Sequence, residues 1–194
     1  MASRRFQKMK RRLGRLRRKF LPADFDPTGT YPGDQADKTF AYRLLSHAEI
    51  EASMEIIALQ TVVRACDRWD RTRKVSLPLL TLVAYCGDAS KEKEGASLSD
   101  RVATAKENYS NDVTRNNGIR AWNVRVLLLP AGVGEHHLGS TWLATISSFG
   151  KLRGETAHGQ TTVTNPDPKS ELDMVTDIVD GLERIDAILT ELRR

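Results

Sequence analysis

Apolar residues recur at helical spacing along most of this 194-residue chain. The first series comprises Phe6, Met9, Leu13, Leu16 and Phe20. Their intervals of three and four residues predict one apolar stripe on a helix. A much longer helix is predicted over residues 37–73, with an apolar face of Phe40, Leu44, Ala48, Ala52, Ile56, Leu59, Val63 and Cys66. The clearest series predicts a last helix, capped by Ser170, that carries Leu172, Val175, Val179, Leu182, Ile185, Leu189 and Leu192.

Shorter helical segments fill the rest of the chain. They are predicted over residues 76–86, 97–116, 119–129 and 140–158, the last being one helix or two that break at Gly150 or Gly154. Asp173 is a weak capping-box partner for Ser170, and no segment alternates long enough to predict a strand. The sequence therefore predicts an all-α bundle of about six or seven helices. We divide it into a basic N-terminal arm (1–20), a Pro/Gly-rich linker (21–36) and a helical domain (37–194).

The charge of the chain is unevenly distributed. The formal net charge is +5, yet residues 1–20 hold ten basic side chains and no acid, which leaves a net charge of −5 on residues 21–194. A basic arm on an acidic body indicates an acidic partner such as nucleic acid or an anionic surface, which would contact Arg11, Arg12, Arg15, Arg17 and Arg18. The apolar stripe of the arm needs a protein surface, which its own domain, a second copy of the chain or a partner protein could supply. A first helix with a merely solvated charged face is the simpler alternative.

The chain lacks the marks of several other protein classes. No apolar run approaches the roughly 20 residues that span a bilayer, and the N-terminus has no apolar segment typical of a secretory signal. A mitochondrial transit peptide remains an alternative because the arm is Arg-rich and acid-free, although it is poor in Ser. Cys66 and Cys86 form no CxxC pair and are expected to be reduced core residues. We expect a cytoplasmic protein.

Two groups of polar residues are weak candidates for a site. Glu135, His136 and His137 are adjacent in a Gly-rich segment, but no second metal-ligand pair accompanies them, so a surface loop explains them and no metal is expected. Arg43, His47 and Glu51 are each one turn apart on the long predicted helix. A buried polar cluster or a surface ladder of ion pairs would explain that spacing equally well.

The third group combines a cation, an acid and an imidazole within six residues, as Arg153, Glu155 and His158. On a helix Glu155 and His158 share a face, so the carboxylate can fix the imidazole tautomer and leave the other ring nitrogen for chemistry. Arginine binds phosphate bidentately, which suits phosphodiester chemistry. The spacing alone fits an ordinary helix-end ion cluster as well.

A wider set of segments changes that picture. The segments are Ala41 with 47–52 (HAEIEA), 116–119 (NNGI) with Asn123, 128–133 (LLPAGV) and 149–158 (FGKLRGETAH). Together they resemble a HEPN domain, closest to the RiboL-PSP-HEPN branch, over about residues 37–192. The resemblance implies a helical fold, no metal or cofactor, and often an endoribonuclease that pairs as a homodimer through its motif face. Arg153 and His158 match the family's Arg-x(4–6)-His motif, and Glu155 would orient His158 or position substrate.

The resemblance has two departures. Gly154 stands where many members have a polar residue, although Gly is usual in this branch. Gln160 stands where some toxins carry a tyrosine that an antitoxin modifies, so that mode of control is not supported. We expect an RNA-cleaving toxin or defence effector that leaves 2′,3′-cyclic phosphate and 5′-hydroxyl ends, with His47 and Glu51 in support. The alternatives are a non-catalytic HEPN module that binds RNA, nucleotide or protein, and a structural helical bundle.

Overall fold

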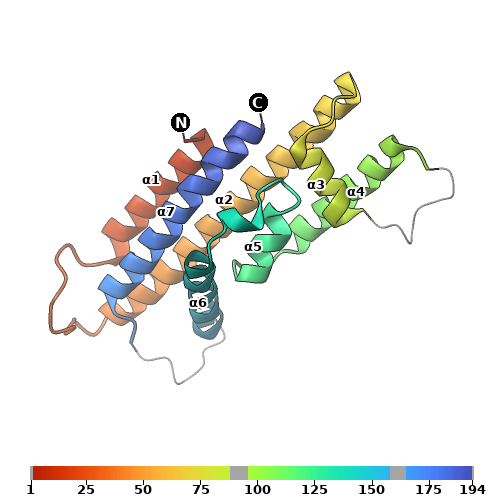
Figure 1. Ribbon diagram of the computed structural model, residues 1–194. Helices are drawn as coiled ribbons and strands as arrows, with labels where there is room; N and C mark the ends of the chain where they lie inside the picture. The colour runs from red at the N-terminus through yellow and green to blue at the C-terminus, as the bar shows by residue number, and fades with distance from the viewer. Residues whose placement is uncertain (1, 88–95, 158–164, 194) are drawn as a thin grey trace.

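The computed structural model describes residues 2–87, 96–157 and 165–193, and these residues form α-helices and one short 3-10 helix but no strand. The prediction of an all-α bundle is confirmed (Figure 1). In chain order the elements are α1 (Arg4–Phe20), α2 (Gln35–Thr72), α3 (Leu77–Cys86), α4 (Leu98–Arg115), α5 (Ala121–Leu128), η2 (Glu135–His137), α6 (Ser140–Ala157) and α7 (Pro168–Leu192).

Helix α2 is the centre of the bundle. It has 38 residues, which at 1.5 Å per residue makes it about 57 Å long. Each of the other six α-helices contacts it, with α1 and α7 along its first part and α3 and α4 around its last part (Figure 1). It ends where Arg73 adopts a left-handed conformation, with φ of 56°.

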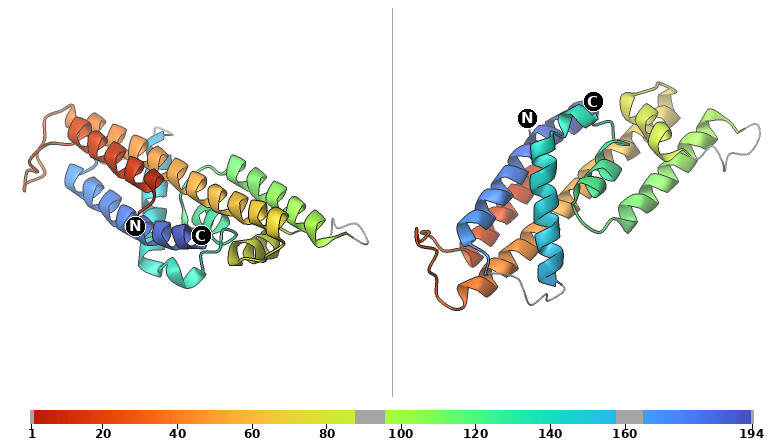
Figure 2. Two further views of the ribbon diagram at one scale, coloured as in Figure 1. Left: turned by 90° about the horizontal axis from the view of Figure 1, so that it is seen from above. Right: turned by 60° about the horizontal axis from the view of Figure 1, so that its bottom comes forward.

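Helix α1 packs on its own domain. Ser3 caps it by accepting a hydrogen bond from the Phe6 backbone amide at 3.1 Å. Phe6, Met9 and Leu13 are fully buried, and Leu16 and Phe20 lie partly buried against the core. Figure 2 shows α1 beside α2 and α7, with the two chain ends close together. The apolar stripe is therefore covered by the chain itself, without a second protein.

Helix α6 packs against α2 and α7 and continues unbroken through Gly150 and Gly154. The indole Nε1 of Trp142 donates a hydrogen bond to the Ile178 carbonyl of α7 at 3.1 Å. The indole lies against Gly181, where an added methyl group would overlap it. This close approach fixes how α6 sits on α7 (Figure 2, right).

The start of the last helix differs from the prediction. Asp167, not Ser170, is the N-cap of α7, because its carboxylate accepts a hydrogen bond from the Ser170 amide at 2.8 Å. Pro168 takes the first helical position, where its missing amide costs nothing. Asp173 pairs with Lys169 instead of forming a capping box. At α3, Ser76 does stand at the N-cap, but its hydroxyl makes no capping hydrogen bond.

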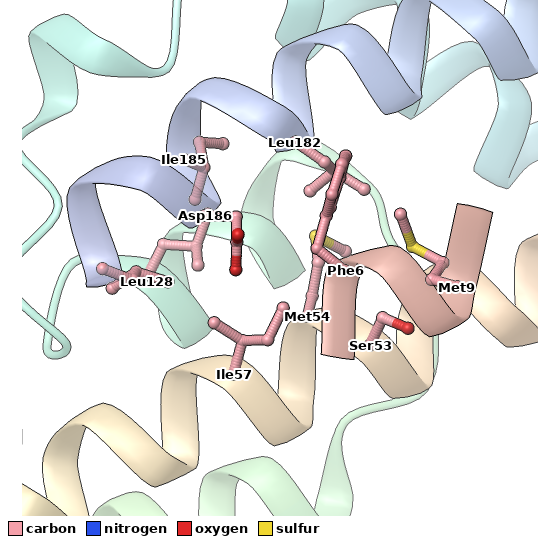
Figure 3. Close-up of a pocket in the computed structure, with 10 residues that line it drawn as sticks. Phe6, Met9, Ser53, Met54, Ile57, Leu128, Leu182, Ile185 and Asp186 are labelled. Carbon is pink, nitrogen blue, oxygen red and sulfur yellow. The ribbon is translucent and has the colours of Figure 1, made fainter. Parts of the chain in front are cut away.

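A small cavity of about 10 Å³ lies in the core between α1, α2, α5 and α7, which at most suits a single water molecule. Figure 3 shows the carboxylate of Asp186 in it, beside Phe6 and above Ile57. Cys66 and Cys86 are buried and free, as expected. Within the described ranges, no helix combines the length and apolar character needed to cross a membrane.

Candidate functional site

Three side chains at four-residue intervals form one row on α2: His47, Glu51 and Glu55. His47 is almost fully buried, with an exposed fraction of 1%, whereas Glu51 and Glu55 are half-buried. Residues four apart lie one above another on a helix, so the row points at a single neighbouring region. That region is the connection between α4 and α5.

Residues 116–118 fold directly onto this row. The Asn116 side-chain amide donates to Glu55 Oε1 at 2.8 Å and to the Gly118 carbonyl at 3.1 Å. The Gly118 backbone amide donates to Glu51 Oε1. Asn123, at the start of α5, donates to Asn116 Oδ1 at 3.0 Å. The Asn-Asn-Gly segment therefore ends α4, as predicted. It also donates hydrogen bonds to the carboxylates of Glu51 and Glu55.

Gly118 has a conformation that other residues rarely adopt. Its φ of 131° lies in the left-handed region, and this geometry directs its amide at Glu51. A side chain at this position would strain the backbone and disturb that hydrogen bond.

Helix α6 completes the cluster from the other side. The Phe149 ring stacks on the His47 ring, with 6.0 Å between centroids and 30° between planes. One residue further on, Gly150 lies against Arg120, and a Cβ there would be 3.1 Å from Arg120 Cγ. The Ser147 hydroxyl accepts a hydrogen bond from the Ala121 amide at 2.8 Å. These contacts hold the second half of α6 against the start of α5.

The electrostatic state of His47 reflects both its burial and Arg153. Burial, together with the smaller effect of the positive charge of Arg153, lowers the pKa of His47 to about 4. The imidazole is therefore neutral at pH 7, and the 3.5 Å separation between Nδ1 and Glu51 Oε2 is not an ion pair. Neither ring nitrogen has a hydrogen-bond partner among the described residues. A buried neutral imidazole of this kind positions its neighbours and does not exchange protons readily with solvent.

The motif residues on α6 are placed only in part. Arg153 is half-buried and acts electrostatically on His47. Glu155 is 30% exposed and pairs with Lys151 at 3.8 Å. His158, the expected general acid or base, lies outside the described residues, and so does Gln160.

The other sequence candidates have local partners. Arg43 is buried and forms a bidentate pair with Glu171 of α7, its Nε lying 3.1 Å from Oε2, so it belongs to the α2–α7 interface. Glu135 of η2 accepts from Arg125 at 2.8 Å and 2.6 Å. Across the ranges that the structure describes, no three His, Cys, Asp or Glu side chains converge as a metal site.

The cations predicted to contact RNA are on the surface of α1. Arg11, Arg12, Arg15, Arg17 and Arg18 are all exposed. Of these, only Arg12 forms an ion pair with a described residue, its Nε lying 3.0 Å from Glu49 Oε2 on α2.

Two residues near the candidate cluster were missed by sequence reasoning. Glu55 is one turn beyond Glu51, so extending the His47–Glu51 spacing would have found it. Arg120 lies in the α4–α5 connection, and its Nη2 would be 3.8 Å from a Cβ at position 154. No sequence pattern marks Arg120, since its importance comes only from the packing of α6.

Comparison with protein-family models, with curated proteins and with solved structures found no match to this chain. The assignment of function therefore depends on the residues themselves. The cluster joins two arginines that can bind phosphate, two carboxylates on a fixed hydrogen-bond network, and a buried imidazole beside the motif helix. This combination suits binding of a phosphodiester next to residues 153–158.

Proposed function

We propose that this protein is a metal-independent endoribonuclease of the HEPN type. One observation carries the proposal: three segments that the resemblance identified, far apart in the sequence, meet at one cluster. His47 and Glu51 come from α2, Asn116 and Gly118 from the α4–α5 connection, and Arg153 from α6. Helical periodicity does not require these segments to meet, whereas a shared site does.

The chemistry needs no metal because RNA carries its own nucleophile. The 2′-oxygen attacks the adjacent phosphorus, and the bond from phosphorus to the 5′-oxygen breaks. The products are a 2′,3′-cyclic phosphate and a 5′-hydroxyl end. One group removes the proton from the 2′-hydroxyl, and another delivers a proton to the departing 5′-oxygen.

Each motif residue has a role in this scheme. His158 would serve as general base or general acid, and the same histidine of a second copy would supply the other role in a homodimer. Arg153 would stabilise the negative charge that develops on the phosphoryl oxygens. Glu155 would orient His158 or the substrate, and His47 and Glu51 would hold the motif helix against the Asn116–Gly118 connection.

The proposed biological setting is that of a toxin or defence effector in the cytoplasm. An antitoxin or a defence-system partner would restrain it. The basic surface of α1 would raise the local concentration of RNA around an acidic body.

The test is cleavage of an end-labelled RNA by purified protein in EDTA. We expect products with 2′,3′-cyclic phosphate ends. Arg153→Ala should lower the rate by about 10²–10³-fold, as loss of one charge-stabilising donor does elsewhere. Lys151→Ala, which removes an exposed cation from the same helix, should leave the rate nearly unchanged.

Three results would count against the nuclease. Unchanged cleavage in both Arg153→Ala and His158→Ala would contradict the site. An equal loss of cleavage rate in Arg153→Ala and Lys151→Ala would mean that Arg153 contributes only its positive charge and has no specific role in the site. RNA retained without any cleavage would favour the non-catalytic module.

A further inference from the structure

A hollow of about 620 Å³ lies on the surface between the start of α1, the middle of α2 and the end of α7. Five cations line it: Arg4, Arg5 and Lys8 of α1, Arg64 of α2, and Arg193 just after α7. None of its lining residues is acidic, and Gln60 and Thr190 add neutral polar groups. Its volume is in the range of small-molecule sites.

The cations in this hollow are close together and poorly neutralised. Burial lowers the pKa of Arg193, and the nearby charge of Arg64 lowers it further, whereas Asp186 raises it. Arg4, Arg5, Lys8 and Arg64 form no ion pair with any residue in the described ranges. Arg5 Nε is buried and has no hydrogen-bond partner there. Like charges held together in this way are costly, and a bound anion would relieve the repulsion.

A carboxylate beneath the hollow fixes its rim. Asp186 is almost completely buried, and it points from α7 toward α2 beside Phe6 (Figure 3). Its Oδ2 accepts a hydrogen bond from the Ser3 amide at 2.6 Å, and its Oδ1 lies 3.9 Å from Arg193 Nη2. Arg193 also donates to the Leu189 carbonyl at 3.0 Å and to Thr190 Oγ1 at 2.9 Å. The start of α1 and the end of α7 are thus locked together around the hollow.

We propose that this hollow binds a chain of phosphate groups. The four cations of the hollow other than Arg193, which faces Asp186, exceed what a single carboxylate would need. Three of these four are arginines, whose planar guanidinium groups bind phosphate oxygens bidentately. A membrane surface fits less well, because insertion needs an exposed apolar face and the apolar stripe of α1 is covered by the core. Ile56, Gln60 and Arg64 form a row on α2 that is turned by about 100° from the row of His47, Glu51 and Glu55. The phosphate site is therefore on a different face of α2 from the proposed nuclease site.

Two sources could supply such a chain: a free oligophosphate, as on a nucleotide, or the backbone of an RNA whose scissile bond lies at the candidate cluster. Calorimetric titration of the full-length protein with inorganic tripolyphosphate tests the shared chemistry. A 2′-O-methyl oligonucleotide with a 5′-hydroxyl, which cannot be cleaved by 2′-oxygen attack, then serves as competitor. Displacement of tripolyphosphate by the oligonucleotide identifies the RNA backbone as the source, and its failure to displace identifies the free oligophosphate.

The variants compare two equal losses of charge. Lys8→Ala with Arg64→Ala removes two exposed cations of the hollow, and we expect tripolyphosphate affinity to fall by about tenfold or more through lost charge-assisted contacts. Arg71→Ala with Arg184→Ala removes two exposed cations outside the hollow and should have little effect. Thermal unfolding verifies that both double variants fold. If a double variant does not fold, its two single variants are measured in its place. Absence of saturable tripolyphosphate binding, or equal weakening by the two pairs, would overturn the proposal, whereas neither result bears on RNA cleavage.

Discussion

His47 is a titratable side chain with almost no access to solvent. It is buried under Phe149, and Arg153 adds positive charge nearby. Sequence spacing placed it beside Glu51, but it could not show whether the pair faced water or the core. The answer depends on α6, which is about a hundred residues later in the chain.

The buried imidazole should make folding stability depend on pH. Its pKa is about 4 in the folded protein against an ordinary value of 6.5. As pH falls below 6.5, the unfolded chain takes up a proton that the folded protein cannot, so stability falls until pH reaches about 4. Between pH 7 and pH 5 this costs about 2 kcal/mol. Urea unfolding at both pH values measures the loss.

The control for this prediction is a pair of substitutions. His47→Gln should reduce the stability loss between pH 7 and pH 5, whatever its effect on stability at pH 7. His136→Gln removes an exposed histidine and should leave the loss unchanged. An identical pH dependence in wild type and His47→Gln would show that His47 is not buried as described.

Arg153 should influence His47 measurably even without any substrate. Because its charge disfavours the imidazolium, Arg153→Gln should raise the pKa of His47. The value should still stay below 6.5, since burial is the larger cause. An NMR titration of the histidine rings gives the shift, with Lys151→Gln as the matched loss of charge on α6. An equal change in the pKa of His47 in both variants would show that Arg153 acts on His47 no more strongly than Lys151 does.

At the scale of elements, the helices were predictable and their contacts were not. Local spacing predicted the apolar stripes of α1 and α7, because a helix face repeats every three or four residues. The apolar face predicted for α2 was wrong, since only Cys66 of its eight residues is buried. The buried apolar side chains of α2 are others, such as Tyr42, Ile50 and Met54, because six helices pack around α2.

For α7, Asp167 followed by Pro168 is a stronger start signal than the predicted cap Ser170. In α6, packing against Arg120 and α2 outweighs the weak helix preference of Gly150 and Gly154, so neither glycine breaks the helix.

Two helical glycines should respond oppositely to alanine. Gly181→Ala should destabilise the protein by about 1–3 kcal/mol, the usual cost of overpacking, because the methyl group would overlap Trp142. Gly14→Ala should stabilise it by up to about 1 kcal/mol, because only Arg18 Nη1 comes near, at 3.9 Å. Chemical denaturation measures both. A neutral Gly181→Ala would mean that α6 and α7 are less tightly packed than described.

At the scale of the whole molecule, charge is separated between neighbouring helices. Arg4, Lys8, Arg11, Arg15 and Arg18 occur at intervals of four and three residues and are all exposed, which gives α1 a basic stripe about 21 Å long. Exposed carboxylates of α7 lie on the far side of its buried face, and one of them, Glu183, pairs with Lys10 at 3.3 Å. The sequence revealed the basic arm, but only the packing shows that this stripe of five cations faces solvent while the apolar stripe of α1 packs on the core.

The proposed role of this stripe in RNA binding is better tested by substitution than by deletion. Removing residues 1–20 would uncover the core that Phe6 and Met9 fill, so loss of binding could reflect unfolding. Replacing Arg11, Arg15 and Arg18 with glutamine keeps the helix. The slope of log affinity against log salt for single-stranded RNA should become shallower by about 2, at roughly 0.7 per lost phosphate contact.

A matched triple variant gives the baseline for this slope. Arg71, Lys74 and Arg184 are exposed cations on other parts of the surface, and their replacement by glutamine removes the same charge. Their slope should stay close to that of wild type. Equal slopes in the two triple variants would mean that the cations of α1 make no specific contact with RNA and that α1 serves only to complete the core.

The central position of α2 also has a consequence for how the protein folds. Since every other α-helix contacts α2, no group of helices can keep its own core when α2 opens. Partial unfolding that frees α1 while preserving the candidate cluster, or the reverse, is therefore costly. Backbone amides in the middle of α2 should exchange with deuterium only through global unfolding, and the molecule should behave as a single cooperative unit.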